Sequence, residues 1–325
     1  MNAHETECRF WQEMPERFRH PRGDFLRDGF APPGGLVADY SIVKRGSEYH
    51  AFYIERRVGG DCSFPGHEIY LGHSSTPDFQ HWTCHGPVML VRPDTWEESH
   101  VFAPFVFEAG GRAAGRAAFA MLYAGQNRWH SQAIGVAFSD DLMEWRRHPG
   151  NPVILPGDYG WACWSDRAVC SCRDPHVNRE GDDFLLYYTA CTREGHSCVA
   201  LAVSRDLVTW KDRGPVYVVP GPHHLESSCV HRVGGGYVLF YSSDGGTRMR
   251  LSERNDDFGR EPGEMVWEGM MGIEVIERHD PIWVVSAFSW PGERLFPAVL
   301  EWSANRPQVK PVRDAAQIAQ FLKTG

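Results

Sequence analysis

The segment Ser75-Thr-Pro-Asp78-Phe79-Gln-His-Trp82 recurs twice along the chain, as Ser139-Asp-Asp141-Leu142-Met-Glu-Trp145 and as Ser204-Arg-Asp206-Leu207-Val-Thr-Trp210. The tryptophans that end the three copies stand at positions 82, 145 and 210, so the two intervals are nearly equal. Each copy follows an apolar run typical of a strand, and its Ser and Asp suit a tight turn before the next strand. A period of this size is typical of a four-stranded propeller blade. Because 325 residues hold about five such periods, the sequence predicts an all-β, five-bladed β-propeller.

A second repeat lies upstream of each copy and is typical of a β-hairpin. The three hairpins begin at Asp39, Asp174 and Glu226, whereas the second blade has no acid in Phe102–Phe107. The acid and the first aromatic residue of the next strand stand at positions 39 and 49, 174 and 184, and 226 and 237, so only the third interval is longer, by one. Because the innermost strands of a propeller converge on its axis, we expect the three carboxyl groups in one central funnel.

The repeats indicate a single domain that spans residues 1–325. We expect residues 1–30 to be an N-terminal extension that packs on the propeller, and residues 306–325 to be a C-terminal tail. The blade pattern weakens after Ser242, where a degraded copy over residues 252–258 precedes Trp267. Helical character is confined to the N-terminus and to residues 314–322.

Three carboxyl groups in one narrow pocket cannot all stay ionised at low cost. Like charges and partial burial raise at least one pKa, which leaves a protonated acid beside ionised partners. One acid can then protonate a leaving glycosidic oxygen while a second acts as base or nucleophile and the third stabilises positive charge on the sugar. Turn capping is the alternative explanation for each acid alone, but three acids at matched hairpin positions favour catalysis.

These motifs resemble the five-bladed propeller hydrolases of glycoside hydrolase families 43 and 32. The stretch Asp39-Tyr-Ser-Ile-Val43 is similar to the Asp-Pro-Ser-Ile-Val opening of family 43, and Arg173-Asp174-Pro175 is similar to the Arg-Asp-Pro triplet of family 32. Glu226-Ser-Ser-Cys229 lies where those families place the catalytic Glu. The resemblance covers roughly residues 37–242.

The resemblance implies a role for each of these residues. Asp39 is expected as the base or nucleophile, Asp174 as the transition-state stabiliser and Glu226 as the general acid. Arg173 is expected to hold sugar hydroxyls through its fork of N–H donors. The Trp-Met-Asn-Asp-Pro-Asn-Gly signature of family 32 is absent around Asp39, and its Glu-Cys pair is opened to Glu226-Ser-Ser-Cys229. Since family 32 retains the anomeric configuration and family 43 inverts it, the stereochemical outcome stays open.

Four further side chains are candidates for binding substrate around the funnel. His100 stands at the entry to the second blade in place of an acid, and His224 lies two residues before Glu226. Trp129 and Trp164 offer indole faces that can stack on a sugar ring. A hydrogen-bonded structural histidine and a packed indole are the alternatives for these residues.

The nine cysteines are an odd number, so at least one thiol is unpaired in a monomer. Buried thiols in a reducing cytoplasm are the first interpretation. A metal site that uses Cys170, Cys172 and nearby histidines is the alternative, although no matched pair of CxxC motifs supports it. The sequence therefore predicts neither a metal nor a cofactor, and the resemblance leaves a structural Ca²⁺ on the propeller axis open.

Charge and hydropathy narrow the choice of partners and location. The net charge is −9 and basic residues are scattered, whereas a nucleic-acid site needs a concentrated basic face. No segment approaches eighteen consecutive apolar residues, so we expect no membrane span. Residues 1–10 lack the apolar run of a signal peptide, which favours a cytoplasmic location; secretion is the alternative if a signal peptide was removed.

The predicted function is that of an exo-acting glycoside hydrolase for a furanoside, either an arabinofuranoside or a fructofuranoside of an oligo- or polysaccharide. The choice of a furanose rests on the resemblance. A transglycosylase or a phosphorylase on the same scaffold is the nearest alternative, because it would pass the glycosyl group to a sugar or to phosphate instead of water. A non-catalytic sugar-binding propeller is an alternative of another class, since a lectin needs no proton donor. A metalloenzyme based on the Cys and His residues is the remaining one.

Overall fold

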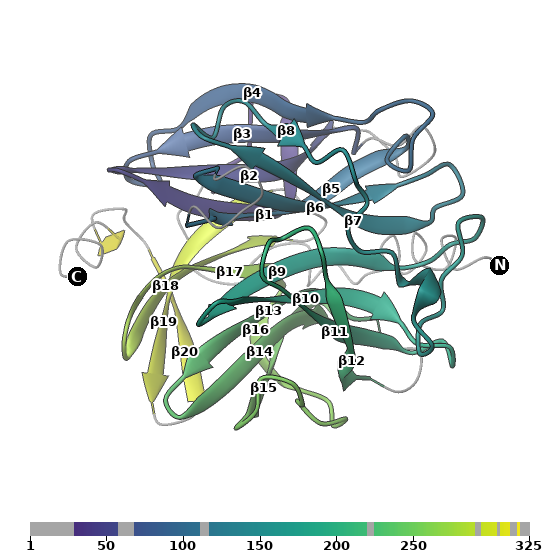
Figure 1. Ribbon diagram of the computed structural model, residues 1–325. Helices are drawn as coiled ribbons and strands as arrows, with labels where there is room; N and C mark the ends of the chain where they lie inside the picture. Colours follow the sequence, from purple (N-terminus) through teal and green to yellow (C-terminus); the bar gives the residue numbers. More distant parts are fainter. Residues whose placement is uncertain are drawn as a thin grey trace.

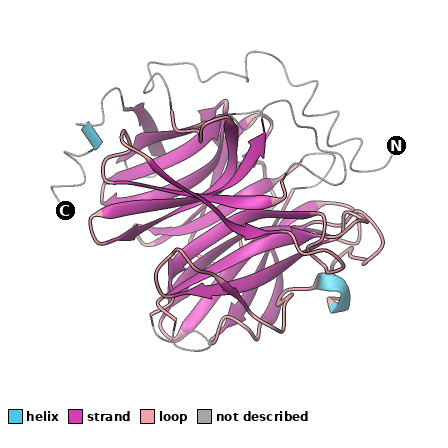
Figure 2. Cartoon of the chain, turned by 90° about the horizontal axis from the view of Figure 1, so that it is seen from above, coloured by secondary structure: helices cyan, strands magenta, loops and turns pink. Residues whose placement is uncertain are grey.

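The computed structural model describes residues 29–57, 68–110, 117–219, 224–289, 294–303, 306–312 and 317–318. In these ranges the chain forms five four-stranded antiparallel sheets around a common axis (Figure 1). Figure 2 shows that strands and their connecting loops account for nearly all of the described chain. Because each sheet uses four strands that are consecutive in sequence, the five-bladed β-propeller predicted from the repeats is confirmed.

The blades follow one another in chain order. Blade one contains β1 (Gly35–Arg45), β2 (Glu48–Arg57), β3 (Tyr70–Thr76) and β4 (Thr83–Leu90). Blade two contains β5 (His100–Glu108), β6 (Phe119–Gln126), β7 (Gln132–Ser139) and β8 (Arg146–Arg147). Blade three contains β9 (Cys172–Glu180), β10 (Asp183–Cys191), β11 (Ser197–Ser204) and β12 (Lys211–Val218). Blade four contains β13 (Glu226–Val233), β14 (Gly236–Ser243), β15 (Gly246–Ser252) and β16 (Glu264–Glu268). Blade five contains β17 (Met270–His279), β18 (Ile282–Ser289), β19 (Leu295–Ser303) and β20 (Arg306–Pro311). A short 3₁₀ helix, η3 (Pro156–Asp158), lies between β8 and β9 in the connection from blade two to blade three.

The repeated segment, which carries Ser-x-Asp in blades two and three and Thr-x-Asp in blade one, forms the turn between the third and fourth strands. In blade three, Asp206 Oδ1 accepts hydrogen bonds from the N–H groups of Val208 at 2.9 Å and Thr209 at 2.7 Å. Ser204 Oγ accepts from the N–H of Leu207 at 2.9 Å, which holds this buried residue at a φ of 68°. Blades one and two repeat these bonds with Thr76 and Asp78 and with Ser139 and Asp141. The motif therefore recurs because its side chains accept hydrogen bonds from backbone N–H groups that the turn leaves without backbone partners.

The tryptophan of each copy lies just before the fourth strand rather than within it. Its indole N–H donates to a carbonyl three residues earlier: Trp82 to Phe79, Trp145 to Leu142 and Trp210 to Leu207, at 3.1–3.2 Å. In the degraded fourth copy, Trp267 lies inside β16. The indole of the first three copies thus closes its own turn, whereas the fourth blade uses a different connection.

We expect Asp206→Ala to lower the free energy of unfolding at pH 7 by about 1–2 kcal/mol, because several turn N–H bonds are lost together. Burial works against the charge of Asp206, but the N–H donors outweigh it and hold the pKa of this carboxyl below its ordinary value. Its contribution is therefore present above the unfolded pKa of about 4 and is lost as the pH falls toward the folded pKa. Urea unfolding at pH 7 and pH 3 measures both effects.

Asp166→Ala is the matched control, since Asp166 is exposed and should change stability by less than about 0.5 kcal/mol. A variant at Asp206 that is as stable as this control at pH 7 would contradict the turn assignment.

The ring closes where blade five meets the segment that precedes blade one. Phe30 and Leu295 exchange two backbone hydrogen bonds of 2.8 Å, and the Phe30 ring stacks on Trp82 with 4.0 Å between centroids. The Tyr40 hydroxyl in β1 donates to Ser286 Oγ in β18 at 2.6 Å. Residues 1–28 of the expected N-terminal extension lie outside the described residues. Its last residue, Phe30, does pack on the propeller and links the first blade to the last.

The sequence predicts a C-terminal tail from residue 306, but the blade continues there with the strand β20 (Arg306–Pro311). β20 pairs antiparallel with β19 and is the outermost strand of blade five. Its residue Val309 packs against the hydrophobic core of blades four and five. Of the expected helix over residues 314–322, only residues 317 and 318 are described, and they are helical. Ile318 is buried against Tyr49 and Phe79, so the chain returns to the propeller beyond β20.

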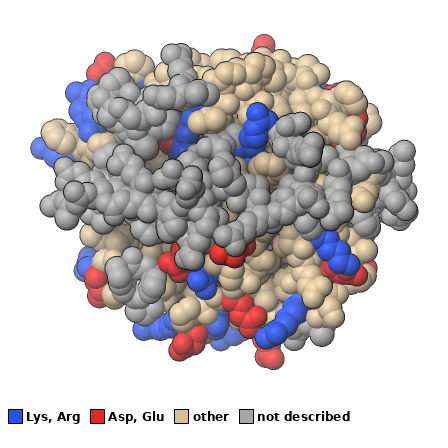
Figure 3. Space-filling view, turned by 180° about the vertical axis from the view of Figure 1, so that it is seen from behind, with Lys and Arg blue, Asp and Glu red and all other residues tan. Residues whose placement is uncertain are grey.

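The described surface carries both signs of charge, interspersed over the face shown in Figure 3. Within the part of the chain that the structure describes, no helix is long and apolar enough to cross a membrane. The seven cysteines described are all free thiols: Cys84, Cys163, Cys170, Cys172, Cys191, Cys198 and Cys229.

Candidate active site

Each innermost strand carries a β-bulge where it reaches the axis. The pairing registers shift between Ala38 and Tyr40, Phe102 and Phe105, Arg173 and His176, Glu226 and Cys229, and Met271 and Glu274. A bulge turns an extra residue out of the regular alternation and re-aims its side chain. The five bulges line one pocket on the axis, here called the axial pocket, whose walls include Asp39, Ala103, Asp174, Ser227 and Gly272.

Four of the five bulges place a residue in the left-handed region of the backbone. The φ values are 46° for Ala103, 55° for Asp174, 49° for Ser227 and 58° for Gly272. A residue other than glycine held there costs on the order of 1–3 kcal/mol and persists only where the surroundings enforce it. Such backbone is concentrated at functional sites, and here it aims an acid and a hydroxyl at the axis.

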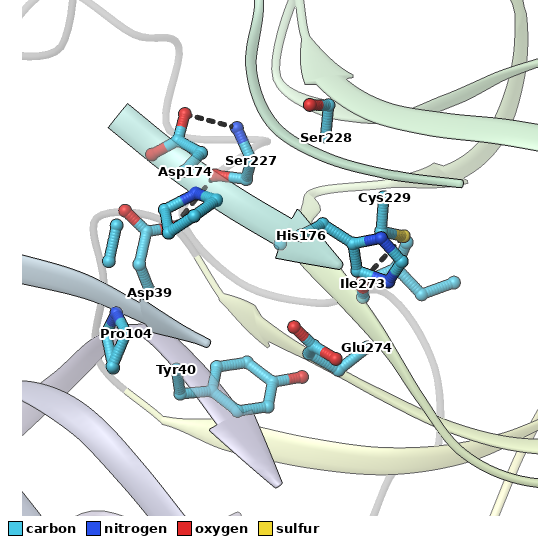
Figure 4. Close-up of a pocket in the computed structure, with 13 residues that line it drawn as sticks. Asp39, Tyr40, Pro104, Asp174, His176, Ser227, Ser228, Cys229, Ile273 and Glu274 are labelled. Carbon is cyan, nitrogen blue, oxygen red and sulfur yellow. Dashed lines mark hydrogen bonds between the residues drawn. The ribbon is translucent and has the colours of Figure 1, made fainter. Parts of the chain in front are cut away.

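Ser227 joins two of the predicted catalytic acids. Its hydroxyl donates to Asp39 Oδ1 at 2.8 Å, and its backbone N–H donates to Asp174 Oδ2 at 2.8 Å. Figure 4 shows these carboxyl groups and Ser227 facing the same space. Thr189 Oγ1 adds a second hydrogen bond to Asp174 Oδ2 at 2.8 Å, and Arg173 Nε lies 3.5 Å from the same oxygen. Blades one, three and four therefore contribute to one polar cluster, as the sequence predicted.

Glu226 joins the cluster through Arg173 and His224 rather than through Ser227. Its Oε2 lies 3.3 Å from Arg173 Nη2 and 3.1 Å from His224 Nε2. Arg173 is buried and lies between the carboxyl groups of Asp174 and Glu226, so one guanidinium links two of the three acids. The three acids and Arg173 that the sequence singled out are thus brought together.

One detail of the sequence analysis is wrong: Glu226 does not occupy the position of Asp39 and Asp174 in the repeat. Ser227 holds that position, because it lies in the bulge and its interval to Tyr237 equals the interval between acid and aromatic residue in the other two hairpins. Glu226 comes one residue earlier and corresponds to Arg173 in blade three. This one-residue offset explains why the interval between acid and aromatic residue is longer by one in the third hairpin. The physical reason is that a bulge adds one residue to the strand, so an acid near the strand start can lie in the bulge or one residue before it.

The electrostatics of the cluster favour protonation of an aspartate over protonation of Glu226. Burial, together with the charges of Asp174 and Glu226, raises the pKa of Asp39 well above its ordinary value. Burial also raises the pKa of Asp174, against the opposing charge of Arg173. Burial acts on Glu226 too, but His224 and Arg173 outweigh it and hold the pKa of Glu226 below its usual range. In the free site, Glu226 is therefore the carboxyl that ionises first.

His100 lies next to the cluster rather than inside it. Gln126 Nε2 is 2.9 Å from His100 Nδ1, and Gln126 Oε1 accepts from Gln132 Nε2 at 3.2 Å. Gln132 Oε1 in turn accepts a hydrogen bond from Arg173 Nη1 at 3.4 Å. Two glutamines that the sequence analysis did not single out thus connect His100 to Arg173. They lie at the end of β6 and the start of β7, where a side-chain amide gives no motif to detect.

The two tryptophans differ in their surroundings. Trp129 follows β6 and is 54% exposed, so its indole face is free to meet solvent or a ligand. Trp164 is half-buried, and its indole N–H donates to the carbonyl of Gln132 at 2.8 Å, which fixes the ring beside the hydrogen-bonded chain. Both residues stay candidates for sugar contact, Trp129 through an open face and Trp164 as part of the wall around Gln132.

The sequence analysis missed an acid in blade five. Glu274 of β17 lines the axial pocket two residues after Gly272, on the side of Tyr40 in Figure 4. Burial, together with the charge of Asp39, raises its pKa to about 8. A neutral carboxyl below the cluster adds no negative charge to it near pH 7. The signal was hard to find because the hairpin pattern is weakest in the last blade.

A five-bladed propeller with Asp39 and Asp174 on its axial pocket, and with Glu226 linked to Asp174 through Arg173, is the arrangement expected of the glycoside hydrolase families that the motifs resemble. The sequence model described as "Glycosyl hydrolases family 32 N-terminal domain" matches residues 30–220, which is more than half of the chain. The chain therefore belongs to glycosyl hydrolase family 32.

A related protein supports the assignment to family 32. The chain is 30% identical over 195 residues to a sucrose-6-phosphate hydrolase of Vibrio alginolyticus, a match that covers 57% of this chain and 35% of that protein. The chain thus spans about a third of the length of this relative.

Solved structures share the fold at lower identity. The family 32 β-fructofuranosidase BmSUC1 of Bombyx mori superposes with a TM-score of 0.67 at 16% identity, over 95% of this chain and 68% of that one. A thermostable family-43 glycoside hydrolase gives a TM-score of 0.65 at 16% identity, over 89% of this chain and 97% of that one. Both families named from the sequence motifs are thus found among the neighbours of this propeller.

Proposed function

We propose that this protein is a glycoside hydrolase that releases a terminal furanose unit, with fructofuranosides as the first candidates and arabinofuranosides as the second. One observation carries the proposal: Ser227 joins Asp39 and Asp174 in the axial pocket, and Arg173 links Asp174 to Glu226. The order of substrates follows the family, because the chain belongs to family 32, of which BmSUC1 is named a β-fructofuranosidase, while the family 43 likeness is of fold alone.

The cluster contains the parts that cleavage of a glycosidic bond needs. Glu226, half-buried beside Arg173 and His224, is the proposed general acid that donates a proton to the leaving oxygen. Asp39 is the proposed nucleophile or base on the opposite side of the sugar. Asp174 is buried, accepts from Ser227 and Thr189, and is the proposed stabiliser of the positive charge on the ring.

These roles require the shared proton to move when a sugar binds. In the free site the proton is favoured on Asp39 because Arg173 and His224 stabilise ionised Glu226. Sugar hydroxyls that accept hydrogen bonds from Arg173 and His224 would draw these donors away from Glu226 and return its pKa upward. Since the three carboxyl groups interact strongly, their titration belongs to the cluster as a whole.

We expect His224→Gln to shift the acidic limb of the kcat/KM profile to higher pH. The kcat/KM profile reports the free enzyme, in which Glu226 is the carboxyl that ionises first, so the acidic limb follows the pKa of Glu226. His224 lowers the pKa of Glu226, and its removal raises that pKa. The measurement is kcat/KM against pH for the wild type and the variant.

The matched control is His148→Gln, which changes a half-buried histidine of blade two that has no contact with the three acids among the described residues. An acidic limb that stays in place, or moves to lower pH, in the His224 variant would contradict the coupling of His224 to Glu226 on which the proposed acid role rests.

The proposal as a whole is tested by incubating the protein with fructofuranosides and arabinofuranosides and following the products by NMR. Free furanose sugar supports hydrolysis, and the first anomer formed decides between retention and inversion. A sugar acceptor or inorganic phosphate added to the same reaction detects transfer in place of hydrolysis. Binding of the sugar without any turnover would contradict the enzymatic proposal.

A further inference from the structure

Three histidines far apart in the sequence gather on one face of blade one. They are His50 of β2, His73 of β3 and His85 of β4, and one ligand nitrogen from each lies within 4.8 Å of the others. His50 Nδ1 is 2.9 Å from His73 Nε2, and the rings of His73 and His85 lie 4.6 Å apart between centroids. None of the three lines the axial pocket, so this cluster is separate from the candidate active site.

The strand register explains why the three side chains share a face. His73 is paired with Phe52, and His50 lies two residues before Phe52, so both histidines point to the same side of the sheet. In β4 the register shifts from Gly86, opposite His73, to Cys84, opposite Ser74. His85 is the extra residue of this bulge, which turns its side chain toward His73 although the regular alternation would point it away.

The surroundings hold the rings in place and leave one side open. Phe52 stacks on His73 at 4.3 Å with an interplanar angle of 9°, which fixes the innermost ring. Ser75 Oγ lies 2.9 Å from His85 Nε2, a polar contact that orients the third ring. His50 and His73 are buried, with 3% and 0% of their surface exposed, whereas His85 is exposed. The cluster is therefore rigid at its base and accessible from solvent at His85.

Without a ligand, the buried imidazole of His73 destabilises this face of the sheet. His73 Nδ1 is buried and has no hydrogen-bond partner among the described residues, and an unsatisfied buried nitrogen is destabilising. A neutral imidazole binds metals through either ring nitrogen, which makes these rings ready ligands.

We propose that His50, His73 and His85 form a binding site for a divalent transition-metal ion of the zinc type, with a water molecule as the fourth ligand on the exposed side. Three imidazoles without a carboxylate suit Zn²⁺, Co²⁺ or Ni²⁺ and do not suit Ca²⁺ or Mg²⁺, which take oxygen ligands. Tetrahedral Zn²⁺ with bonds of about 2.0–2.1 Å places its nitrogen ligands about 3.3 Å apart. The separations in the cluster bracket this value, so small shifts of the exposed ring complete the geometry.

Such an ion would join the three outer strands of blade one, including the edge strand β4. It would not touch the three carboxyl groups, so the proposal stands independently of the proposed glycosidase activity.

Titration of the metal-free full-length protein with ZnCl₂ by calorimetry tests the site, after treatment with EDTA and removal of the chelator. We expect one Zn²⁺ per chain for the wild type, and visible d–d bands of tetrahedral coordination when CoCl₂ replaces ZnCl₂. His85→Ala should weaken the binding of Zn²⁺ by more than about 100-fold, because loss of a mere supporting partner already costs about 10–100-fold. Since His85 is exposed, this variant should keep the fold.

Two further variants complete the test. His81→Ala removes another exposed histidine of blade one, whose Nδ1 lies 2.7 Å from Asp78 Oδ2, and it should bind Zn²⁺ as the wild type does. Ser75→Ala should weaken binding by about 10–100-fold, because it removes the group that orients His85. The proposal is wrong if the wild type binds no Zn²⁺, if His85→Ala binds it as tightly as the wild type, or if His81→Ala loses it to the same extent.

Discussion

Replacement of Glu226 by Gln should lower kcat/KM toward a furanoside with a sugar leaving group by about 10²–10⁴-fold, the usual contribution of a general acid. A nitrophenyl furanoside should suffer far less, since nitrophenolate departs without a proton. The glutamine keeps the size of the side chain and can still bond Arg173, so the propeller should stay intact. Steady-state kinetics with both substrates, together with a melting curve, measure the effect.

Glu253→Gln is the matched control for this substitution. Glu253 is exposed in the loop after β15, away from the axial pocket, and its amide variant should retain the activity of the wild type on both substrates. Near-normal turnover of the sugar-linked substrate by Glu226→Gln would remove Glu226 from the acid role. Equal losses on both substrates would show that this carboxyl does more than donate a proton.

Asp39→Asn should have a still larger effect, a loss of at least about 10⁴-fold on both substrates. Whether Asp39 attacks the sugar or activates a water, its carboxylate is needed at a step that does not depend on the leaving group. An asparagine oxygen can still accept the hydrogen bond from Ser227, so the local structure should survive. Single-turnover kinetics with the nitrophenyl furanoside separate this loss from any change in binding.

The control for Asp39 is Asp166→Asn, an exposed aspartate that makes no side-chain hydrogen bond in the described part of the chain. It should retain wild-type rates. The assignment of Asp39 fails if its amide variant keeps more than about one percent of the activity, or if only the sugar-linked substrate is affected.

The propeller was predictable because its turns carry their own chemistry. The Ser-x-Asp segments of blades two and three and the Thr-x-Asp segment of blade one accept hydrogen bonds from N–H groups that each such turn must satisfy, so the motif recurs and sets the period. The segment is degraded in blade four, where Trp267 lies inside β16, so the boundaries of the last two blades could not be read from a motif. The strand β20 was overlooked for that reason.

The site was predictable at the level of residues but not of register. A bulge inserts one residue into a strand and leaves no mark in composition, so the offset between Glu226 and Asp174 emerged only from the pairing of strands. Glu274, Gln126 and Gln132 were missed because their importance lies in what they touch. The histidine cluster had no sequence signature either, since its members stand far apart, at positions 50, 73 and 85, on three different strands.

The central claim is that the three carboxyl groups at the axis act together on one furanose ring. Proton NMR of the wild type and of the Asp39→Asn, Glu226→Gln double variant, each incubated with a fructofuranoside, an arabinofuranoside and the matching pyranosides, tests it most directly. The account predicts free sugar from at least one furanoside, none from the pyranosides, and no product from the double variant. Undiminished release of sugar by the double variant, or a wild type that leaves both furanosides intact, would contradict it.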